Sequence, residues 1–319
     1  MRAWSRLRHS TPGHLCRLNN LALTLVITAA ILHATWNFLL KKSGGGIGVL
    51  TLSAVTATAL LTPFSLYLIV RGFTFTPAMI GMIMGSGIFH LAYFLLLDRA
   101  YRGAGGGGGT GNSSGAGNGG DLSIVYPLAR ATGPLLTIVA ATLFLGERMS
   151  PIAIGGALLI GVSALLLTGN LKKLLSKDAK SGARFALMCG SMIACYTLWD
   201  KQGVAAFLIP PIIFDWGANL VRIIMMIPLA HQRQPGAMTL AWRHHRKAIL
   251  AIGVMSPLSY ILVLTAMVFT PVSYVAPARE LSILFAALIG TQILKEGQAA
   301  RRSIAAVGMV LGISALALG

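Results

Sequence analysis

Apolar runs long enough to cross a lipid bilayer recur along almost the whole chain, and they constrain its fold more than any other feature. A membrane-spanning helix needs roughly 20 consecutive apolar residues. Lipid offers no partners for backbone polar groups, so such runs must be helical. They are too continuous for the alternating strands of a membrane barrel. The sequence predicts ten spans: Leu21–Leu40, Gly48–Val70, Pro77–Leu97, Leu122–Leu145, Ile152–Thr168, Ala183–Trp199, Ile209–Ala230, Ala248–Phe269, Val272–Leu294 and Ser303–Leu318.

The composition agrees with a chain that lies mostly in lipid. Of its 319 residues, 55% are hydrophobic and 11% are charged, whereas a soluble domain has about 25% charged residues. A disordered chain needs low hydrophobicity and many charges, so disorder is excluded too. The net charge of +18 would suggest nucleic acid in a soluble protein. Here most basic residues flank the spans, as in membrane proteins, and we expect no nucleic-acid partner.

Two unusual connections define the predicted domain organisation. Residues 103–120 contain 11 glycines and lack the Gly-Lys-Ser/Thr ending of a phosphate-binding loop, so they predict a flexible insertion. Residues 171–184 form a basic connector between two groups of five spans. The sequence thus predicts a polar N-terminal arm over residues 1–20, a first half over residues 21–170 and a second half over residues 185–319.

The two halves carry a similar motif in their fourth spans. In each half an arginine follows a proline within the span, and a glutamate stands 17 residues later: Arg130 with Glu147, and Arg279 with Glu296. A Gly-x-Ser-Ala-Leu pentapeptide then recurs in the last span of each half. Because each half has an odd number of spans, the second half must be inverted relative to the first. Inverted repeats are typical of secondary transporters, which bind substrate between the repeats near the bilayer midplane.

At these positions the sequence resembles a known family. The stretches His33–Lys42, Asp121–Pro151 and Ala276–Glu296 are similar to the drug/metabolite transporter superfamily, specifically the EamA-type proteins of bacteria. The resemblance implies ten helices in two inverted halves, no bound cofactor, and movement of small metabolites or drugs. The N-terminal arm, the glycine-rich insertion and the sequence Lys295-Glu296-Gly297 depart from the family pattern.

Polar and ionisable side chains within the spans are the candidate functional residues. A charge at the centre of a bilayer costs about 2.5–3.5 kcal/mol on insertion scales, so such groups face the bundle interior or a water-filled cavity. The cysteines and histidines have no metal-ligand spacing, and we expect no metal. The candidate substrate-cavity residues are His33, Trp36, Asn37, His90, Tyr126, Arg130, Asp215, Asn219, Arg222, Arg279 and Glu280.

Asp215, Asn219 and Arg222 lie at positions i, i+4 and i+7, and therefore share one helical face. Two interpretations are open. The aspartate and the arginine could form an internal ion pair that neutralises both charges in lipid. Alternatively, the three side chains could form a polar wall of the substrate cavity.

Arg130 and Arg279 also have two interpretations. Each could be a structural bridge to carbonyl or carboxylate oxygens, or could recognise an anionic group of the substrate, because a guanidinium offers a fixed bidentate fork. Glu280 follows Arg279 directly and could take up a proton or bind a cationic group. Glu147 and Glu296 lie at the ends of spans, which favours a structural role.

Aromatic residues end the first span of each half. Trp36 could be an interfacial anchor or an aromatic cavity wall, while His33 and Asn37 share a face. His33 and His90 could be neutral, hydrogen-bonded residues or could carry a coupling proton. The Trp199-Asp200 pair would suit a cationic substrate, but the lysine that follows favours a position at the membrane interface.

The charge distribution predicts an orientation. With Arg184 counted in the basic connector, the lysines and arginines outside the spans number 16 on one side and 7 on the other. The positive-inside rule then places both termini outside the cytoplasm. The family resemblance favours cytoplasmic termini, so both orientations stay open.

These features together predict a multi-pass secondary transporter of the bacterial inner membrane. We expect an exporter of an amino-acid-like, organic-anion or drug-like metabolite that works by alternating access, as a monomer or homodimer. There is no nucleotide-binding motif for ATP-driven transport. The alternatives are a non-transporting membrane scaffold and a membrane enzyme acting on lipid, which would need clustered catalytic residues near an interface. The only histidine pair, His244-His245, lies in a basic segment that reads as a loop touching lipid headgroups, and we expect no enzymatic activity.

Overall fold

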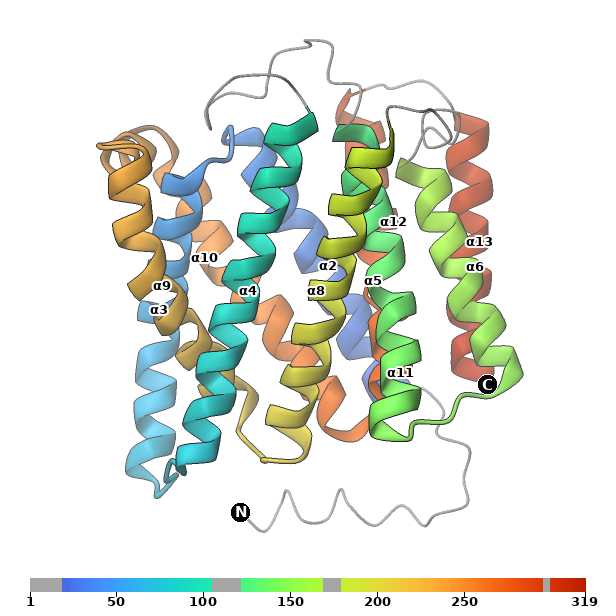
Figure 1. Cartoon of the computed structure of the whole chain (residues 1–319), viewed down its shortest axis with the longest axis horizontal. Helices are drawn as coiled ribbons and strands as arrows, with labels where there is room; N and C mark the ends of the chain where they lie inside the picture. The colour runs from blue at the N-terminus through green and yellow to red at the C-terminus, as the bar shows by residue number, and fades with distance from the viewer. Residues whose placement is uncertain (1–18, 105–121, 169–178, 295–298) are drawn as a thin grey trace.

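The computed structural model describes residues 19–104, 122–168, 179–294 and 299–319 (Figure 1). Within these ranges the chain is helical, without a strand, which confirms the all-α class. The helices lie side by side and run roughly along one direction. They are α2 (Asn20–Lys42), α3 (Ile47–Val70), α4 (Pro77–Ala104), α5 (Leu122–Leu145), α6 (Pro151–Thr168), α8 (Ala179–Ala205), α9 (Pro211–Arg233), α10 (Ala237–Phe269), α11 (Val272–Ala278), α12 (Leu281–Leu294) and α13 (Ala299–Leu318).

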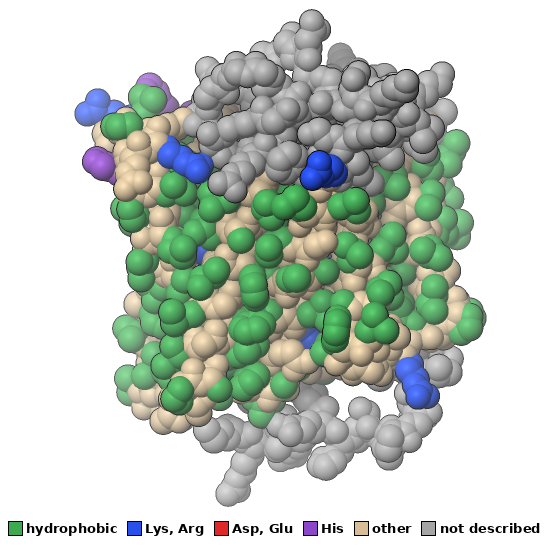
Figure 2. All heavy atoms as spheres, viewed as in Figure 1, with side chains coloured by type: hydrophobic (Ala, Val, Ile, Leu, Met, Phe, Trp, Pro, Cys, Tyr) green, Lys and Arg blue, Asp and Glu red, His purple; other side chains and the backbone are tan. Residues whose placement is uncertain are grey.

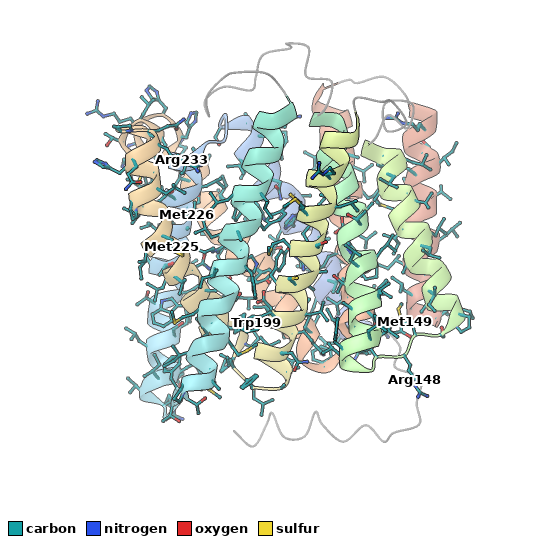
Figure 3. All side chains as sticks on the ribbon, viewed as in Figure 1. Arg148, Met149, Trp199, Met225, Met226 and Arg233 are labelled. Atoms are coloured by element: carbon teal, nitrogen blue, oxygen red, sulfur yellow. The ribbon has the colours of Figure 1, made fainter. Side chains whose placement is uncertain are left out.

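Six stretches of helix in the described part of the chain are long and apolar enough to cross a membrane. They are Asn20–Lys42, Ile47–Val70, Pro77–Leu96, Pro211–Arg233, Ala237–Phe269 and Val272–Ile289. Hydrophobic side chains cover most of the face shown in Figure 2, and the blue and purple side chains of Lys, Arg and His gather toward its upper and lower ends. Arg148 and Arg233 lie at opposite ends of the molecule (Figure 3). The chain is therefore suited to a membrane-embedded, multi-pass protein.

Helix α2 begins and ends on local sequence signals. The Asn19 side chain accepts a hydrogen bond of 2.7 Å from the Ala22 N–H, and such caps satisfy an otherwise free donor of the first turn. Lys41 and Lys42 lie in the last turn, where positive charge is favourable against the helix dipole. Three glycines with positive φ follow and turn the chain toward α3.

The predicted ninth span is wrong as a single helix. The chain forms α11, turns at Arg279 and Glu280, and continues as α12. Pro277 lacks a backbone N–H and cannot donate to the preceding turn. The Glu280 N–H bonds to the Pro277 carbonyl at 3.0 Å and the Ser282 N–H bonds to the Arg279 carbonyl at 3.1 Å, an i→i+3 pattern that is tighter than an α-helix.

The basic stretch before the predicted eighth span is also helical, so the loop predicted there is wrong. Helix α10 begins at Ala237, and only His245 leaves the helical region, with φ −129° and ψ 20°. No glycine or proline interrupts the sequence from Ala237 to Ile252, and arginine and lysine are good helix formers. The predicted loop is therefore a kinked helical extension.

Helices of the two predicted halves pack on one another. The most extensive contacts join α5 with α8, α6 with α13 and α10 with α2, while α3 packs on α9. At the α6–α13 contact a Cβ added to Gly156 would lie 2.6 Å from the Gly312 carbonyl oxygen. Small residues allow such close approach between membrane helices. The broken helix α11 lies in this core, with Tyr274 fully buried.

Candidate functional site

The short helix α11 is anchored at its first turn by a residue of the first half. Glu147 accepts hydrogen bonds of 2.9 Å from the backbone N–H groups of Val272 and Ser273, and one of 2.7 Å from the Ser273 hydroxyl. Glycine 146 precedes this glutamate with φ +65°, and such a turn directs the chain out of α5. The geometry is that of a helix cap and agrees with the structural role predicted for Glu147.

The other end of α11 leads into a buried ion pair. Arg130 Nε, on α5, lies 2.9 Å from Glu280 Oε2, and the two side chains are 12% and 9% exposed. The same guanidinium donates to Ser282 Oγ through Nη2 at 2.7 Å, and its Nη1 lies 3.3 Å from His33 Nε2. We call these four residues the Arg130 cluster. They come from α2, α5, the α11–α12 break and the first turn of α12, and three of them are predicted site residues.

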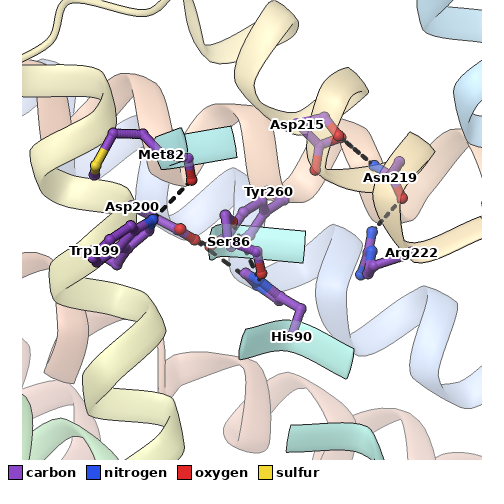
Figure 4. Close-up of polar contacts among 9 residues, drawn as sticks. All are labelled: Met82, Ser86, His90, Trp199, Asp200, Asp215, Asn219, Arg222 and Tyr260. Carbon is purple, nitrogen blue, oxygen red and sulfur yellow. Dashed lines mark hydrogen bonds and ion pairs between the residues drawn. The ribbon is translucent and has the colours of Figure 1, made fainter. Parts of the chain in front are cut away.

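A second set surrounds Asp200, on α8; Figure 4 shows this aspartate with Ser86, His90 and Tyr260. The Tyr260 hydroxyl of α10 donates to the Asp200 carboxylate, and His90 Nε2 of α4 lies 3.9 Å from the same Oδ2 atom. His90 Nδ1 lies 2.9 Å from the Ser86 carbonyl oxygen, and its ring stacks at 4.3 Å on Tyr196. We call these five residues the Asp200 cluster; its aspartate is fully buried.

Arg279 connects the two clusters. It follows α11 and precedes Glu280 of the Arg130 cluster, while its guanidinium carbon lies 5.7 Å from the centroid of the Tyr260 ring. A cation within about 6 Å of an aromatic face is attracted by the ring quadrupole. The helix break therefore presents an arginine to one cluster and a glutamate to the other.

The three polar residues of α9 form a chain along one helical face (Figure 4). Asn219 Nδ2 donates to Asp215 Oδ2 at 3.0 Å, and Arg222 donates to the amide oxygen of Asn219. The shared face is as predicted. Among the described residues, Asp215 and Arg222 do not form the direct ion pair that one interpretation predicted. Instead, the Asn219 amide bonds to both side chains. Asp215 and Asn219 are buried.

The two other candidates of α2 are less connected. Trp36 packs edge-on against His33, with ring centroids 5.0 Å apart, and contacts a separate apolar cluster of α3 and α10. The Asn37 amide donates to the His33 carbonyl within the same helix, at 2.8 Å. Trp36 and Asn37 therefore contact His33 and its helix turn. Of these three residues of α2, His33 is the one that contacts Arg130.

Several predicted features fall outside the part that the structure describes. Tyr126 lies in α5, in a stretch whose side chains are not described. The same holds for Glu296, for most of the glycine-rich segment 103–120, for residues 1–18 of the N-terminal arm, and for the first part of the basic connector 171–184.

Sequence reasoning did not select Asp200, Tyr260 or Ser282 as site residues, and Asp200 is fully buried within the bundle. The neighbouring lysine suggested a position at the membrane interface. Lys201 Nζ bonds to the carbonyls of Met267 and Thr270 at 2.6 and 2.9 Å, which satisfies the C-terminal end of α10. The internal repeat offers a signal for Asp200, because Trp199-Asp200 stands at the end of the first span of the second half, as the candidates Trp36 and Asn37 do in the first half.

The arrangement can exchange partners with a charged ligand. Arg130 is a rigid bidentate donor that now bonds a carboxylate of the protein, and Glu280 is a buried acceptor. A carboxylate on a ligand could take the place of Glu280 on the guanidinium, and an ammonium could take the place of Arg130. Asp200 and His90 supply further titratable groups in the same region.

Comparisons with known proteins inform on the fold. No family model matches the sequence, and no curated protein matches it. A solved structure described as "Crystal structure of protein" aligns with a TM-score of 0.70 and 16% sequence identity, over 93% of this chain and 97% of that one. At this identity the likeness concerns the fold alone, and it extends over nearly the whole of both chains.

Proposed function

We propose that this protein is a secondary transporter that exports a small metabolite by alternating access, as a multi-pass protein of a bacterial inner membrane. The observation that carries the proposal is the buried Arg130–Glu280 pair, which joins a helix of the first half to a helix break in the second. Ionisable groups inside spans mark substrate or ion pathways. Discontinuous helices at the junction of two repeats line the binding sites of secondary transporters.

We further propose that ten spans form two inverted repeats of the drug/metabolite transporter type. The packing partners support this arrangement. Helix α4 packs on α8, and α10 packs on α2; each of these pairs joins the third span of one half to the first span of the other. Helices α6 and α13, which pack together, are the last spans of the two halves, and α3 and α9 are the second.

The proposed substrate is amino-acid-like, because the site offers complementary charges at hydrogen-bond distance. A substrate carboxylate would bind Arg130, and a substrate ammonium would bind Glu280. A ligand that satisfies both groups replaces the internal pair without leaving a charge stranded in the bundle, and a stranded charge is costly. An organic anion would satisfy only the arginine. We expect such anions to bind more weakly than zwitterions.

Flux in proteoliposomes tests the proposal. Purified protein is reconstituted and loaded with unlabelled amino acids, organic anions or organic cations, and uptake of a labelled member of each class is followed by counterflow. We expect flux with amino acids, and its loss in Arg130→Lys, because lysine cannot reproduce the bidentate fork. Arg148→Lys, at an exposed position, is the matched control and should transport normally.

Absence of flux with all three classes, in protein whose circular dichroism and size-exclusion profile show that it is folded, would contradict transport. A non-transporting scaffold predicts that result. Normal flux in Arg130→Lys would contradict the proposed binding site while leaving transport intact.

A further inference from the structure

A basic pocket opens between the end of α2 and the kink of α10, away from the two clusters. Its volume is about 460 Å³, and it is lined by Leu39, Lys42, Ser43, Arg243, His244, His245, Arg246, Lys247 and Ala248. The kink at His245 interrupts the helical path of α10. Basic side chains before and after the kink therefore border one concave site, together with the last turn of α2.

The rim of this pocket carries a concentrated positive charge. Lys42, Arg243, Arg246 and Lys247 are exposed, and no acidic residue is among those that line the pocket. Four fixed cations around one cavity attract an anion, and arginine matches the geometry of phosphate oxygens in particular. The pocket therefore suits a phosphate group.

Apolar side chains also line the pocket, which distinguishes it from a site for free phosphate. Leu39 and Ala248 pack against a buried hydrophobic cluster that includes Ile249. On the neighbouring surface of α10, Trp242 is 46% exposed and Leu240 is 61% exposed. Tryptophan is enriched at the boundary between lipid tails and water. Cations beside apolar side chains, next to membrane-compatible helices, match the headgroup and the adjoining acyl chain of one lipid.

We propose that this pocket binds the phosphate headgroup of an anionic phospholipid. Clusters of Lys and Arg next to a membrane helix attract anionic lipids, and basic pockets between helices on the cytoplasmic side bind their headgroups. The pocket lies on the side that the positive-inside count assigns to the cytoplasm. It lies between the end of α2 and the kink of α10, the helices that carry His33 and Tyr260 of the two clusters.

The test uses full-length protein in an uncharged detergent and isothermal titration calorimetry with dioctanoyl phosphatidylglycerol. Dioctanoyl phosphatidylcholine and inorganic phosphate are titrated in parallel. The variant Lys42→Gln/Arg246→Gln removes two charges from the pocket. Arg71→Gln/Arg148→Gln removes two exposed charges elsewhere and is the matched control. Because each cation near an anionic lipid strengthens attraction, we expect the pocket variant to bind phosphatidylglycerol about 30-fold more weakly, or about 2 kcal/mol, with the control unchanged.

Each alternative result overturns the proposal. Equal affinity for phosphatidylcholine would mean that the lipid is not recognised through its negative charge. Equal affinity for inorganic phosphate would make the site one for a free anion. An unchanged affinity of the pocket variant for phosphatidylglycerol would mean that the lipid binds elsewhere on the surface. If the double variant does not fold, Lys247→Gln alone should weaken phosphatidylglycerol binding about 5-fold. An unchanged affinity of Lys247→Gln would likewise mean that the lipid binds elsewhere.

Discussion

Replacing Arg130 by methionine removes one charge from a pair whose side chains are 12% and 9% exposed. At a separation of 2.9 Å and an effective dielectric constant of about 20, Coulomb's law gives an attraction of about 6 kcal/mol, before desolvation is subtracted. The variant leaves the Glu280 carboxylate without its partner inside the bundle. We expect the free energy of unfolding to fall by about 3–5 kcal/mol, as in other buried pairs that lose one member.

A second replacement separates the structural from the functional role of the pair. Glu280→Leu added to Arg130→Met removes the stranded charge, so most of the lost stability should return. The four proteins of this double-mutant cycle are unfolded with sodium dodecyl sulfate in mixed micelles and followed by circular dichroism, and we expect a coupling free energy of about 2–4 kcal/mol. Flux in proteoliposomes should be lost in Arg130→Met, in Glu280→Leu and in the double variant, even though the double variant regains stability.

The control for this cycle is Arg148→Met, an exposed position where the change should stay within about 0.5 kcal/mol. A coupling free energy near zero would refute the electrostatic reasoning, since it would mean that Arg130 and Glu280 contribute independently. Flux that returns with stability in the double variant would refute the role of the pair in substrate binding.

Three further predictions follow from contacts elsewhere in the bundle. Glu147→Ala removes the cap of α11 and should cost about 3 kcal/mol of unfolding free energy, because hydrogen bonds to a charged group contribute about 1.5–3 kcal/mol; Arg148→Ala beside it should be neutral in the same titration. Gly156→Ala should destabilise by about 1–3 kcal/mol, because its Cβ would meet a backbone carbonyl at 2.6 Å. A Cβ added at Gly155 would meet no atom within 4 Å, so Gly155→Ala should stabilise by about 0.5–1 kcal/mol. Equal shifts of the thermal unfolding temperature in Gly155→Ala and Gly156→Ala would contradict the close packing at Gly156. Asp200→Asn keeps an acceptor for the tyrosine hydroxyl but loses the charge, and we expect folded protein with flux reduced at least tenfold in counterflow; unchanged flux would exclude this carboxylate from the pathway.

The sequence was informative wherever one local rule decided the outcome. Long apolar runs must be helical in lipid, and the described parts of the predicted spans form helices. A charge in such a run turns inward because lipid cannot solvate it, which is why Arg130, Asp215 and Glu280 could be selected without knowledge of the fold. The common face of Asp215 and Asn219 follows from helical spacing alone.

Partners could not be predicted, because they depend on how distant helices pack. Arg130 and Glu280 are 150 positions apart, and nothing in either span specifies the other. The missed Asp200 shows the opposite difficulty. Its neighbour Lys201 suggested an exposed end, but a lysine can extend its amine to the free carbonyls of an adjacent helix, and the aspartate then stays inside. Pro277 itself was a local signal for the helix break that follows it. The apolar run Val272–Leu294 has the length of one membrane span, so the sequence was interpreted as a single helix.

The two contacts of α11 with the first half have different consequences for motion. The helix has 7 residues and is therefore about 10 Å long. Glu147 holds its first turn by accepting three hydrogen bonds, two of them from backbone N–H groups. Just beyond the far end of α11, Arg130 pairs with the Glu280 carboxylate, the group that the proposed substrate would displace. Under the proposed function, a ligand that competes for Arg130 would free one end of α11 while the other stays fixed, and we expect α11 to pivot about the Glu147 cap. Under the proposed alternating access, the cap must persist through the cycle, so we expect Glu147→Ala to lower counterflow in proteoliposomes as well as the free energy of unfolding.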